Sequence, residues 1–342
     1  MKVTIKQIAE ISGVHRSTVD KVLHDREGVS DEVRQRVKNI IKELGYKPNI
    51  IGKALACQNK PLLIAVLLLR VDAVEEMKAG IDEAYSEYKN FGLEIEYYFT
   101  NDLDTAQQIN TINLLKSKKI SGLIISPIHD TNVMSAINEL VDKGIPVITI
   151  NSDIPESKRM CFVGQDMIMA GKVAGDLMGE ILNGKGKVAV ITGSENLLCT
   201  RERKRGFESV ISKKYPNISI VEVIETYEQK IVAFQKTISL LRKVEDLRGI
   251  YITCGSVSEV GKAVRLMNKE NEIKIISFDL YPEIVELVKD GVINFTIGQD
   301  LFAQGFKAIK VLFEYLFFDK NPETEHIKTS IDIRLKENID LS

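Results

Sequence analysis

Hydrophobic positions follow a helical period over residues 1–46, and the rest of the chain alternates short apolar runs with amphipathic segments. Alternation of strands with helices predicts parallel sheets that are covered by helices on both faces. Roughly 280 residues carry this pattern, which is too many for one sheet, so we expect two similar lobes. Strands are predicted at 62–69, 93–99, 121–126, 146–150, 187–192, 218–224, 249–253, 273–277 and 293–297.

The first 46 residues are predicted to form three short helices. Thr4 and Gln7 make a capping box ahead of the first helix, and Gly13 ends it. The second helix is expected over about residues 16–24, and Ser30 is placed to cap the third.

The segment Thr4–Leu23 fits a helix-turn-helix. Two helices that cross at a tight turn need a small residue and a flexible one, which Ala9 and Gly13 supply. Val14 and Val19 are placed to fill the angle between the helices, which leaves the second helix free to enter a major groove. A small helical bundle of another purpose is the alternative.

Charge is distributed unevenly along a chain whose net charge is only −2. Residues 1–60 carry twelve Lys and Arg against seven Asp and Glu, a net charge of +5, which leaves −7 for the rest. A basic head on an acidic body is typical of a nucleic-acid reader.

The four cysteines, at 57, 161, 199 and 254, are far apart and form neither a zinc motif nor a disulfide framework. Such thiols are typical of a reducing cytosol, and the N-terminal sequence has no apolar core of a signal peptide. The longest apolar run, Leu62–Leu69, is too short to span a bilayer. We therefore expect a cytoplasmic protein with no membrane contact, no metal and no cofactor.

Ligands of parallel α/β sheets bind beyond the carboxyl ends of the strands, so the residues that follow each strand are candidates. They are rich in groups that bond hydroxyls and contain no catalytic constellation. A sugar or another polyol is the natural ligand for such groups. The candidates are Arg70, Asp72, Ser126, Asn151, Ser152, Asp153, Ser194, Arg201, Gly255, Asp279 and Gln299.

Three motifs resemble the lac repressor (LacI/GalR) family: T-I-K-Q-I-A-E-I-S-G-V-x-x-S-T-V from Thr4, G-V-S-D-E-V-R-Q-R-V from Gly28, and L-G-Y-K-P-N-x-x-G-K-A-L-A from Leu44. Later segments, including G-I-P-V-I-T-I-N-S-D from Gly144, resemble periplasmic sugar-binding proteins of the ribose type. The resemblance implies an N-terminal all-α helix-turn-helix head and a two-lobed, periplasmic-binding-protein-like α/β core.

This organisation divides the chain into a head at 1–46, a hinge helix and linker at 47–60, and an effector-binding core at 61–342. Within the core, lobe 1 is expected at about 61–150 and 293–323. Lobe 2 is expected at about 152–290 and 324–342.

The resemblance also implies which head residues meet DNA. Arg16 is the best candidate for reading a base, because arginine can bond guanine through O6 and N7 together. A phosphate contact, or an ion pair with Asp20, is the alternative for Arg16. Asp20 and Lys21 stand where the family more often has Ser and Arg, so its usual operator does not transfer. The expected DNA-binding residues of the head are Thr4, His15, Arg16, Ser17, Thr18, Asp20 and Lys21.

Residues Pro48–Ala56 resemble the family's hinge helix, which enters the minor groove as a pair. Leu55 would wedge between base pairs, and Asn49 and Lys53 would contact DNA nearby. Gly52 disfavours the helix by about 1 kcal/mol, so the hinge is expected to be unfolded away from DNA. Ordinary packing is the alternative for Leu55.

In the core, the resemblance implies sugar contacts by Asn151, Arg201, Asp279 and Gln299, to which the position of Arg70 after the first strand adds a fifth candidate. Asp279 could instead cap the next helix, and Arg201 could belong to a charged surface. Asn151 replaces the family's more usual Asp, so the particular sugar cannot be inferred.

The sequence therefore predicts a homodimeric transcriptional regulator, expected to be a repressor, that binds a double-stranded DNA operator under the control of a sugar or polyol. A purine or nucleoside effector is the alternative. A solute-binding protein is disfavoured by the basic head and the absent signal peptide. An enzyme on a nucleotide-binding fold would need a glycine-rich turn after the first strand, and L-L-L-R-V-D-A has none.

Overall fold

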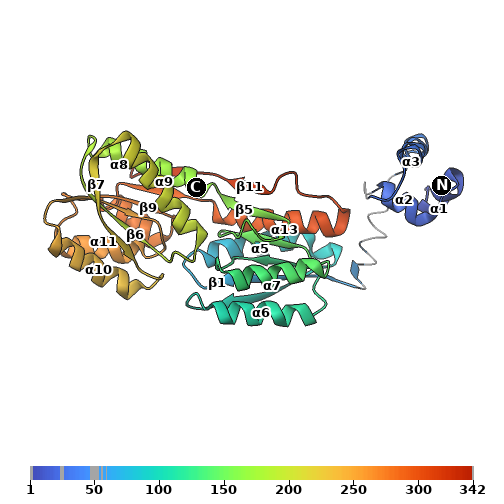
Figure 1. Ribbon diagram of the computed structural model, residues 1–342, viewed down its shortest axis with the longest axis horizontal. Helices are drawn as coiled ribbons and strands as arrows, with labels where there is room; N and C mark the ends of the chain where they lie inside the picture. The colour runs from blue at the N-terminus through green and yellow to red at the C-terminus, as the bar shows by residue number, and fades with distance from the viewer. Residues whose placement is uncertain (1–2, 24–26, 47–53, 55–56, 59, 341–342) are drawn as a thin grey trace.

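The protein is described by a computed structural model, which covers residues 3–23, 27–46, 54, 57–58 and 60–340. A small helical head is followed by a core of two α/β lobes (Figure 1). The predicted fold class is confirmed.

The head consists of α1 (Ile5–Ser12), α2 (Arg16–Leu23) and α3 (Asp31–Glu43). The capping box is confirmed, since Gln7 N–H donates to Thr4 Oγ1 and Thr4 N–H donates to Gln7 Oε1. Gly13 ends α1 in a left-handed conformation with φ of 64°. Ser30 occupies the N-cap position of α3, as predicted, but its side chain makes no capping hydrogen bond. Asp31 and Glu32 in the first turn provide the favourable charge at this helix end.

The three head helices enclose one small core. Ile8, Ala9, Val19, Val22 and Val37 are buried in it. Ala9 and Val19 therefore lie where the crossing of α1 and α2 requires them.

Each lobe of the core contains one six-stranded sheet. The first has the order β11-β5-β4-β3-β1-β2, and the second has the order β12-β10-β9-β8-β6-β7. The β10–β12 pair is antiparallel, and the other described pairs are parallel. The strands of the first sheet are β1 (Leu62–Leu69), β2 (Leu93–Thr100), β3 (Gly122–Ile125), β4 (Val147–Ile150), β5 (Cys161–Gln165) and β11 (His326–Thr329). Those of the second are β6 (Lys185–Thr192), β7 (Asn217–Glu225), β8 (Leu247–Ile252), β9 (Lys274–Phe278), β10 (Phe295–Gly298) and β12 (Asp332–Arg334).

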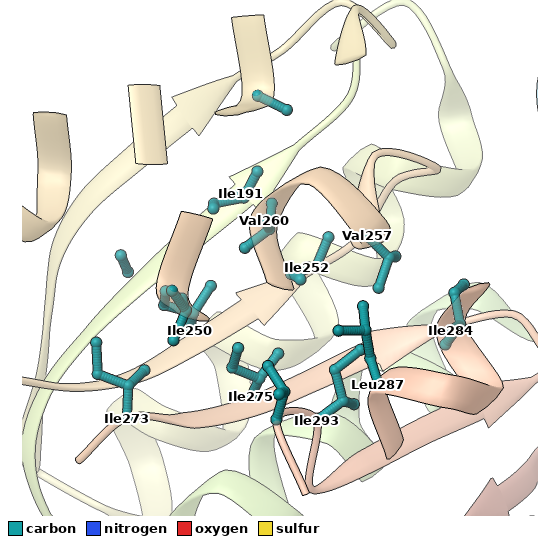
Figure 2. Close-up of a cluster of buried hydrophobic side chains, with 14 of the residues drawn as sticks. Ile191, Ile250, Ile252, Val257, Val260, Ile273, Ile275, Ile284, Leu287 and Ile293 are labelled. Carbon is teal, nitrogen blue, oxygen red and sulfur yellow. The ribbon is translucent and has the colours of Figure 1, made fainter. Parts of the chain in front are cut away.

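Helices cover both faces of each sheet, and apolar side chains fill the space between. In the first lobe, α5 (Val74–Tyr88) and α13 (Leu301–Phe318) pack on one face, and α6 (Thr105–Ser117) and α7 (Thr131–Asp142) on the other. A short 3₁₀ helix, η1 (Lys89–Phe91), leads into β2. In the second lobe, α8 (Met167–Ile181) and α9 (Leu198–Lys214) form one layer. The other layer contains α10 (Lys230–Lys243), α11 (Val257–Leu266) and α12 (Pro282–Lys289), and Figure 2 shows the branched aliphatic side chains beneath α11 and α12.

The expected division between the lobes needs correction at three places. Strands β5 and β11 belong to the first sheet, and β10 belongs to the second. The chain therefore crosses between lobes after β5, after β10 and after β11. The three strands β5, β11 and β12 were not predicted, because β5 (C-F-V-G-Q) contains a glycine and ends in a polar residue, and because β11 and β12 (H-I-K-T and D-I-R) contain one apolar residue each.

Among the described residues, no helix is both long and apolar enough to cross a membrane.

Candidate effector cleft and DNA-reading head

A cavity lies between the two lobes at the carboxyl ends of the strands. Leu69, Asp72 and Asn151 line it from the first lobe. Arg203, Glu228, Asp279 and Gln299 are among the residues that line it from the second. Parallel sheets place ligands at this edge, so the cavity is where the strand order predicts a binding site.

Gln299 is the centre of a buried hydrogen-bond network in this cavity. Its Nε2 donates to Asp279 Oδ1 at 2.5 Å. Its Oε1 accepts from Arg203 Nη2 at 2.7 Å and from Asn151 Nδ2 at 3.3 Å. All four side chains are less than a tenth exposed. The structure thus brings together three of the predicted effector residues, Asn151, Asp279 and Gln299.

The arginine of this network is Arg203, not Arg201. Arg203 is 4% exposed, and its Nη1 donates to the Thr253 carbonyl at 3.3 Å. Arg201 points elsewhere, with its Nη2 3.4 Å from His129 Nε2, and lines a separate cavity. The sequence contains arginines at 201, 203 and 205, and choosing among them required knowing which side of α9 faces the sheet.

Close packing of α8 on α9 fixes the position of Arg203. Gly171 of α8 touches the backbone of Arg203, and a Cβ at Gly171 would overlap the Arg203 carbonyl oxygen. Gly206, three residues after Arg203 and on the same side of α9, makes the reciprocal contact with Ile168. The spacing of Arg203 and Gly206 (R-x-x-G) therefore indicates, in the sequence itself, that Arg203 and not Arg201 lies on the side of α9 that contacts α8.

Arg70 does not reach the cavity. It is exposed, and its guanidinium lies over the ring of Phe99, with Cζ 4.5 Å from the ring centroid. The expectation that Arg70 belongs to the ligand site is therefore wrong for this arrangement of the lobes. Asp72, two residues later, lines the cavity together with its neighbours Val71 and Ala73.

Asp279 is held in an unusual backbone conformation with φ of 73°. Its carbonyl accepts from Thr296 Oγ1 at 2.7 Å, which ties the residue to β10. The next helix, α12, has Tyr281 at its N-cap position, so Asp279 is not the helix cap that was the alternative. Burial raises the pKa of the Asp279 carboxyl, and the nearby Arg203 acts in the opposite direction.

Glu228 is a cavity residue that the sequence reasoning missed. It follows β7 in a loop where Tyr227 and Glu228 both have positive φ, 55° and 59°. Its Oε2 accepts from Gly255 N–H at 3.1 Å. Burial raises the pKa of the Glu228 carboxyl to about 7, and the negative charge of Asp72 adds to the shift.

Further contacts join the lobes around the cavity, beside the bond from Asn151 to Gln299. Lys230 Nζ lies 3.0 Å from Asp72 Oδ1, and His129 N–H donates to the Asn196 carbonyl at 2.8 Å. An apolar cluster also spans the cleft, with Leu69, Ile128 and Phe162 on one side. Met167, Leu197, Leu198 and Cys199 complete it from the other side.

In the head, the predicted DNA-reading residues gather at the start of α2. His15, Arg16, Ser17 and Lys21 are exposed, as is Thr4. Thr18 and Asp20 are half-buried. The residues Asn49, Lys53 and Leu55 lie outside the described part of the chain.

His15 caps α2. Its Nδ1 accepts from Ser17 N–H at 3.3 Å and lies 2.8 Å from Ser17 Oγ. Its carbonyl accepts from Thr18 N–H at 2.8 Å. Arg16 is thereby presented at the exposed first turn of the helix, where a major-groove contact is possible.

Two family models match the chain over adjoining regions. The model for bacterial regulatory proteins of the lacI family matches residues 4–49. The model for a periplasmic binding protein domain matches residues 69–320.

Characterised relatives are transcription regulators. The HTH-type transcriptional regulator MalR of Streptococcus pneumoniae is 26% identical over 290 residues, which cover 82% of this chain and 84% of MalR. Catabolite control protein A of Staphylococcus aureus is 22% identical over 339 residues, which cover 94% of this chain and 95% of that protein.

Solved structures of sugar-binding proteins share the fold of the core. GanP, a glucose-galactose binding protein from Geobacillus stearothermophilus, is 27% identical with a TM-score of 0.76 and covers 82% of this chain and 100% of its own. AraP, an arabinose binding protein from the same organism, is 28% identical with a TM-score of 0.67 and covers 82% of this chain and 99% of its own. With its helix-turn-helix head and two-lobed core, the chain belongs to the lacI family of bacterial transcription regulators, which bind DNA and are not enzymes.

Proposed function

We propose that this regulator is controlled by a sugar that binds between the two lobes of the core. The observation that carries the proposal is the Gln299-centred network, in which two amides, a carboxylate and a guanidinium meet in one buried cavity. Each of these groups can bond adjacent hydroxyls of a polyol, and burial strengthens such bonds. The likeness of the core to GanP and AraP supports a sugar over other ligands.

A purine or nucleoside effector is less favoured by the lining of the cavity. Recognition of a base normally uses an aromatic platform on which the ring stacks. Tyr281 is the one aromatic side chain among the described residues of the lining. Polar and small aliphatic groups make up the remainder, as a sugar site requires.

We propose that the effector controls DNA binding by changing the position of one lobe relative to the other. A ligand that bonds Asn151 on one side and Asp279 on the other changes how tightly the lobes close. The first lobe joins the head through residues 47–60, so closure alters the spacing of two heads in a dimer. We propose a cytoplasmic homodimer that represses transcription from a near-palindromic operator, because one helix-turn-helix reads only a few base pairs.

Thermal-shift screening of the full chain against monosaccharides and nucleosides tests the effector. A ligand that binds only the folded state raises the melting temperature, so a response to sugars and not to nucleosides is expected. The same ligands would then be added to a complex with DNA selected from a random library, and anisotropy would follow release. A rise in melting temperature with nucleosides and with none of the sugars would contradict the proposal.

A further inference from the structure

Carboxylates outnumber cations in the cleft. The cavity between the lobes contains Asp72, Glu228 and Asp279 against Arg203. A neighbouring cavity shares Asp279 and Gln299 with it and adds Glu76, Asp300 and Asp332 against Arg334. A ligand in this region therefore lies in a field of predominantly negative charge.

Most of these carboxylates have a compensating partner. Asp72 is paired with Lys230 at 3.0 Å, and Asp332 with Arg334 at 2.6 Å. Asp300 accepts from Ala303 N–H at the start of α13. Asp279 bonds Gln299 and lies in the field of Arg203.

Of the three carboxylates that line the cavity between the lobes, Glu228 is the one with no side-chain partner among the described residues, since Asp72 pairs with Lys230 and Asp279 accepts from Gln299. Its one described hydrogen bond comes from the Gly255 N–H. The carboxylate is tucked against Gly193, where a Cβ would overlap Glu228 Oε1. The same cavity holds Arg203, whose Nε is buried without a hydrogen-bond partner. The other guanidinium nitrogens of Arg203 donate to the Thr253 carbonyl and to Gln299 Oε1, and no ion pair between Arg203 and Glu228 is present.

A half-buried carboxylate without a cation is unfavourable in the free protein. A hydroxyl of a bound ligand would relieve that cost in part. An ammonium group would relieve it more fully, because a charge-assisted bond is roughly twice as strong as a neutral one.

We propose that the effector is an amine-bearing sugar whose ammonium group is held by Glu228, while its hydroxyls bond Asp279, Gln299 and Arg203. The inference rests on the proposed sugar site and narrows its ligand class. Uronic acids and sugar phosphates are disfavoured by the same charges.

Calorimetric titration of the full chain with matched ligands at pH 7 tests this inference. Each set contains a neutral sugar, its 2-amino form and its N-acetyl form: glucose with glucosamine and N-acetylglucosamine, and the galactose equivalents. The N-acetyl form keeps the nitrogen and removes its charge. The wild type is expected to bind one amino sugar at least about tenfold more tightly than both neutral counterparts.

Glu228→Gln should reduce that preference to within about twofold while retaining the weaker binding of the neutral sugar. The matched control is Glu222→Gln on β7, where Glu222 pairs with Lys243 away from the cavity. It should keep the preference of the wild type.

A wild type that binds the neutral sugar as tightly as the amine overturns the inference and leaves the proposed sugar site intact. The same holds if Glu228→Gln keeps the tenfold preference. Binding of no sugar in either set overturns the inference, and the proposed function is overturned as well if no monosaccharide in the thermal-shift screen binds.

Discussion

The guanidinium of Arg203 lies over the ring of Phe278, with its Cζ 4.0 Å from the ring centroid. Phe278 is the last residue of β9 and directly precedes Asp279. Its ring therefore positions the Arg203 guanidinium at the end of the strand, where the cavity lies. This contact distinguishes Arg203 from Arg201 and leads to the first prediction.

Arg203→Met should weaken effector binding about ten- to a hundredfold, because a buried charge-assisted hydrogen bond contributes roughly 1.5–3 kcal/mol. Arg201→Met, the matched control on the same helix, should change affinity less than about threefold. Calorimetry with the effector found by screening measures both. If both variants lost the same amount of effector affinity, Arg201 would belong to the effector site as much as Arg203 does.

Asp279→Asn should reduce effector affinity by a similar factor while leaving operator affinity unchanged. Asparagine tolerates the positive φ of this position, so the substitution removes charge with little change in backbone. Release of DNA by effector, followed by anisotropy, is the measurement, with the exposed Asp290→Asn as control. A mutant that responds at the wild-type effector concentration would show that Asp279 does not touch the ligand.

Glu228 should make the protein less stable as pH rises. In the unfolded chain its pKa is near 4.3, and in the folded protein it is raised to about 7. Between these values the folded state holds a proton that the unfolded state has lost, so stability falls with rising pH through this window. The charges that face Glu228 are Asp72 and Asp279, which raise its pKa, and Arg203, which lowers it; Lys230 is paired with Asp72.

Glu228→Gln should therefore raise the free energy of unfolding at pH 8 by roughly 2 kcal/mol and by much less at pH 5. Urea denaturation at the two pH values, beside the Glu222→Gln control, provides the comparison. A gain of equal size at both pH values would assign the effect to packing instead of charge.

Gly171→Ala should disturb the crossing of α8 and α9 and displace Arg203. The added methyl group would overlap backbone that cannot move aside easily, at a cost of about 1–3 kcal/mol in stability. Gly175→Ala on the same helix provides a graded comparison, because its Cβ would meet its nearest atoms at 3.0 Å. Thermal melts and effector titrations should show the larger loss for Gly171→Ala, and the reverse order would contradict the proposed crossing.

In the head, Arg16→Ala should weaken operator binding by roughly 1–3 kcal/mol and relax sequence preference at one base pair. Lys6→Ala on α1, where Lys6 lies 3.9 Å from Glu10, is the control. Anisotropy against the operator and against single-base variants separates base reading from phosphate contact. Uniform loss across all sequences would make Arg16 a phosphate contact only.

The sequence was sufficient for the features that depend on local pattern. Nine of the strands were predicted within a few residues, because the edge strands β2 and β7 alternate apolar with polar positions and most of the others are continuous apolar runs. Asn151, Asp279 and Gln299 could be named because each directly follows such a run, and the strand ends of parallel sheets converge.

Features that depend on helix rotation or loop conformation were not accessible in this way. Arg201 and Arg203 differ in which side of α9 they occupy, and that side is set by contact with α8. Glu228 was missed because its direction depends on two consecutive residues with positive φ, which a pattern of polar and apolar positions does not encode.

The three crossings between lobes also have a consequence for synthesis of the chain. The first sheet receives β11 at its edge, beside β5, from residues 326–329, and the helix α13 that covers one face of it from residues 301–318. A nascent chain that has emerged only as far as β5 therefore has an unpaired strand edge at β5 and an apolar sheet face that α5 alone covers in part. Both stay open while the second lobe emerges, so we expect chains that end before residue 326 to aggregate more readily than the full chain.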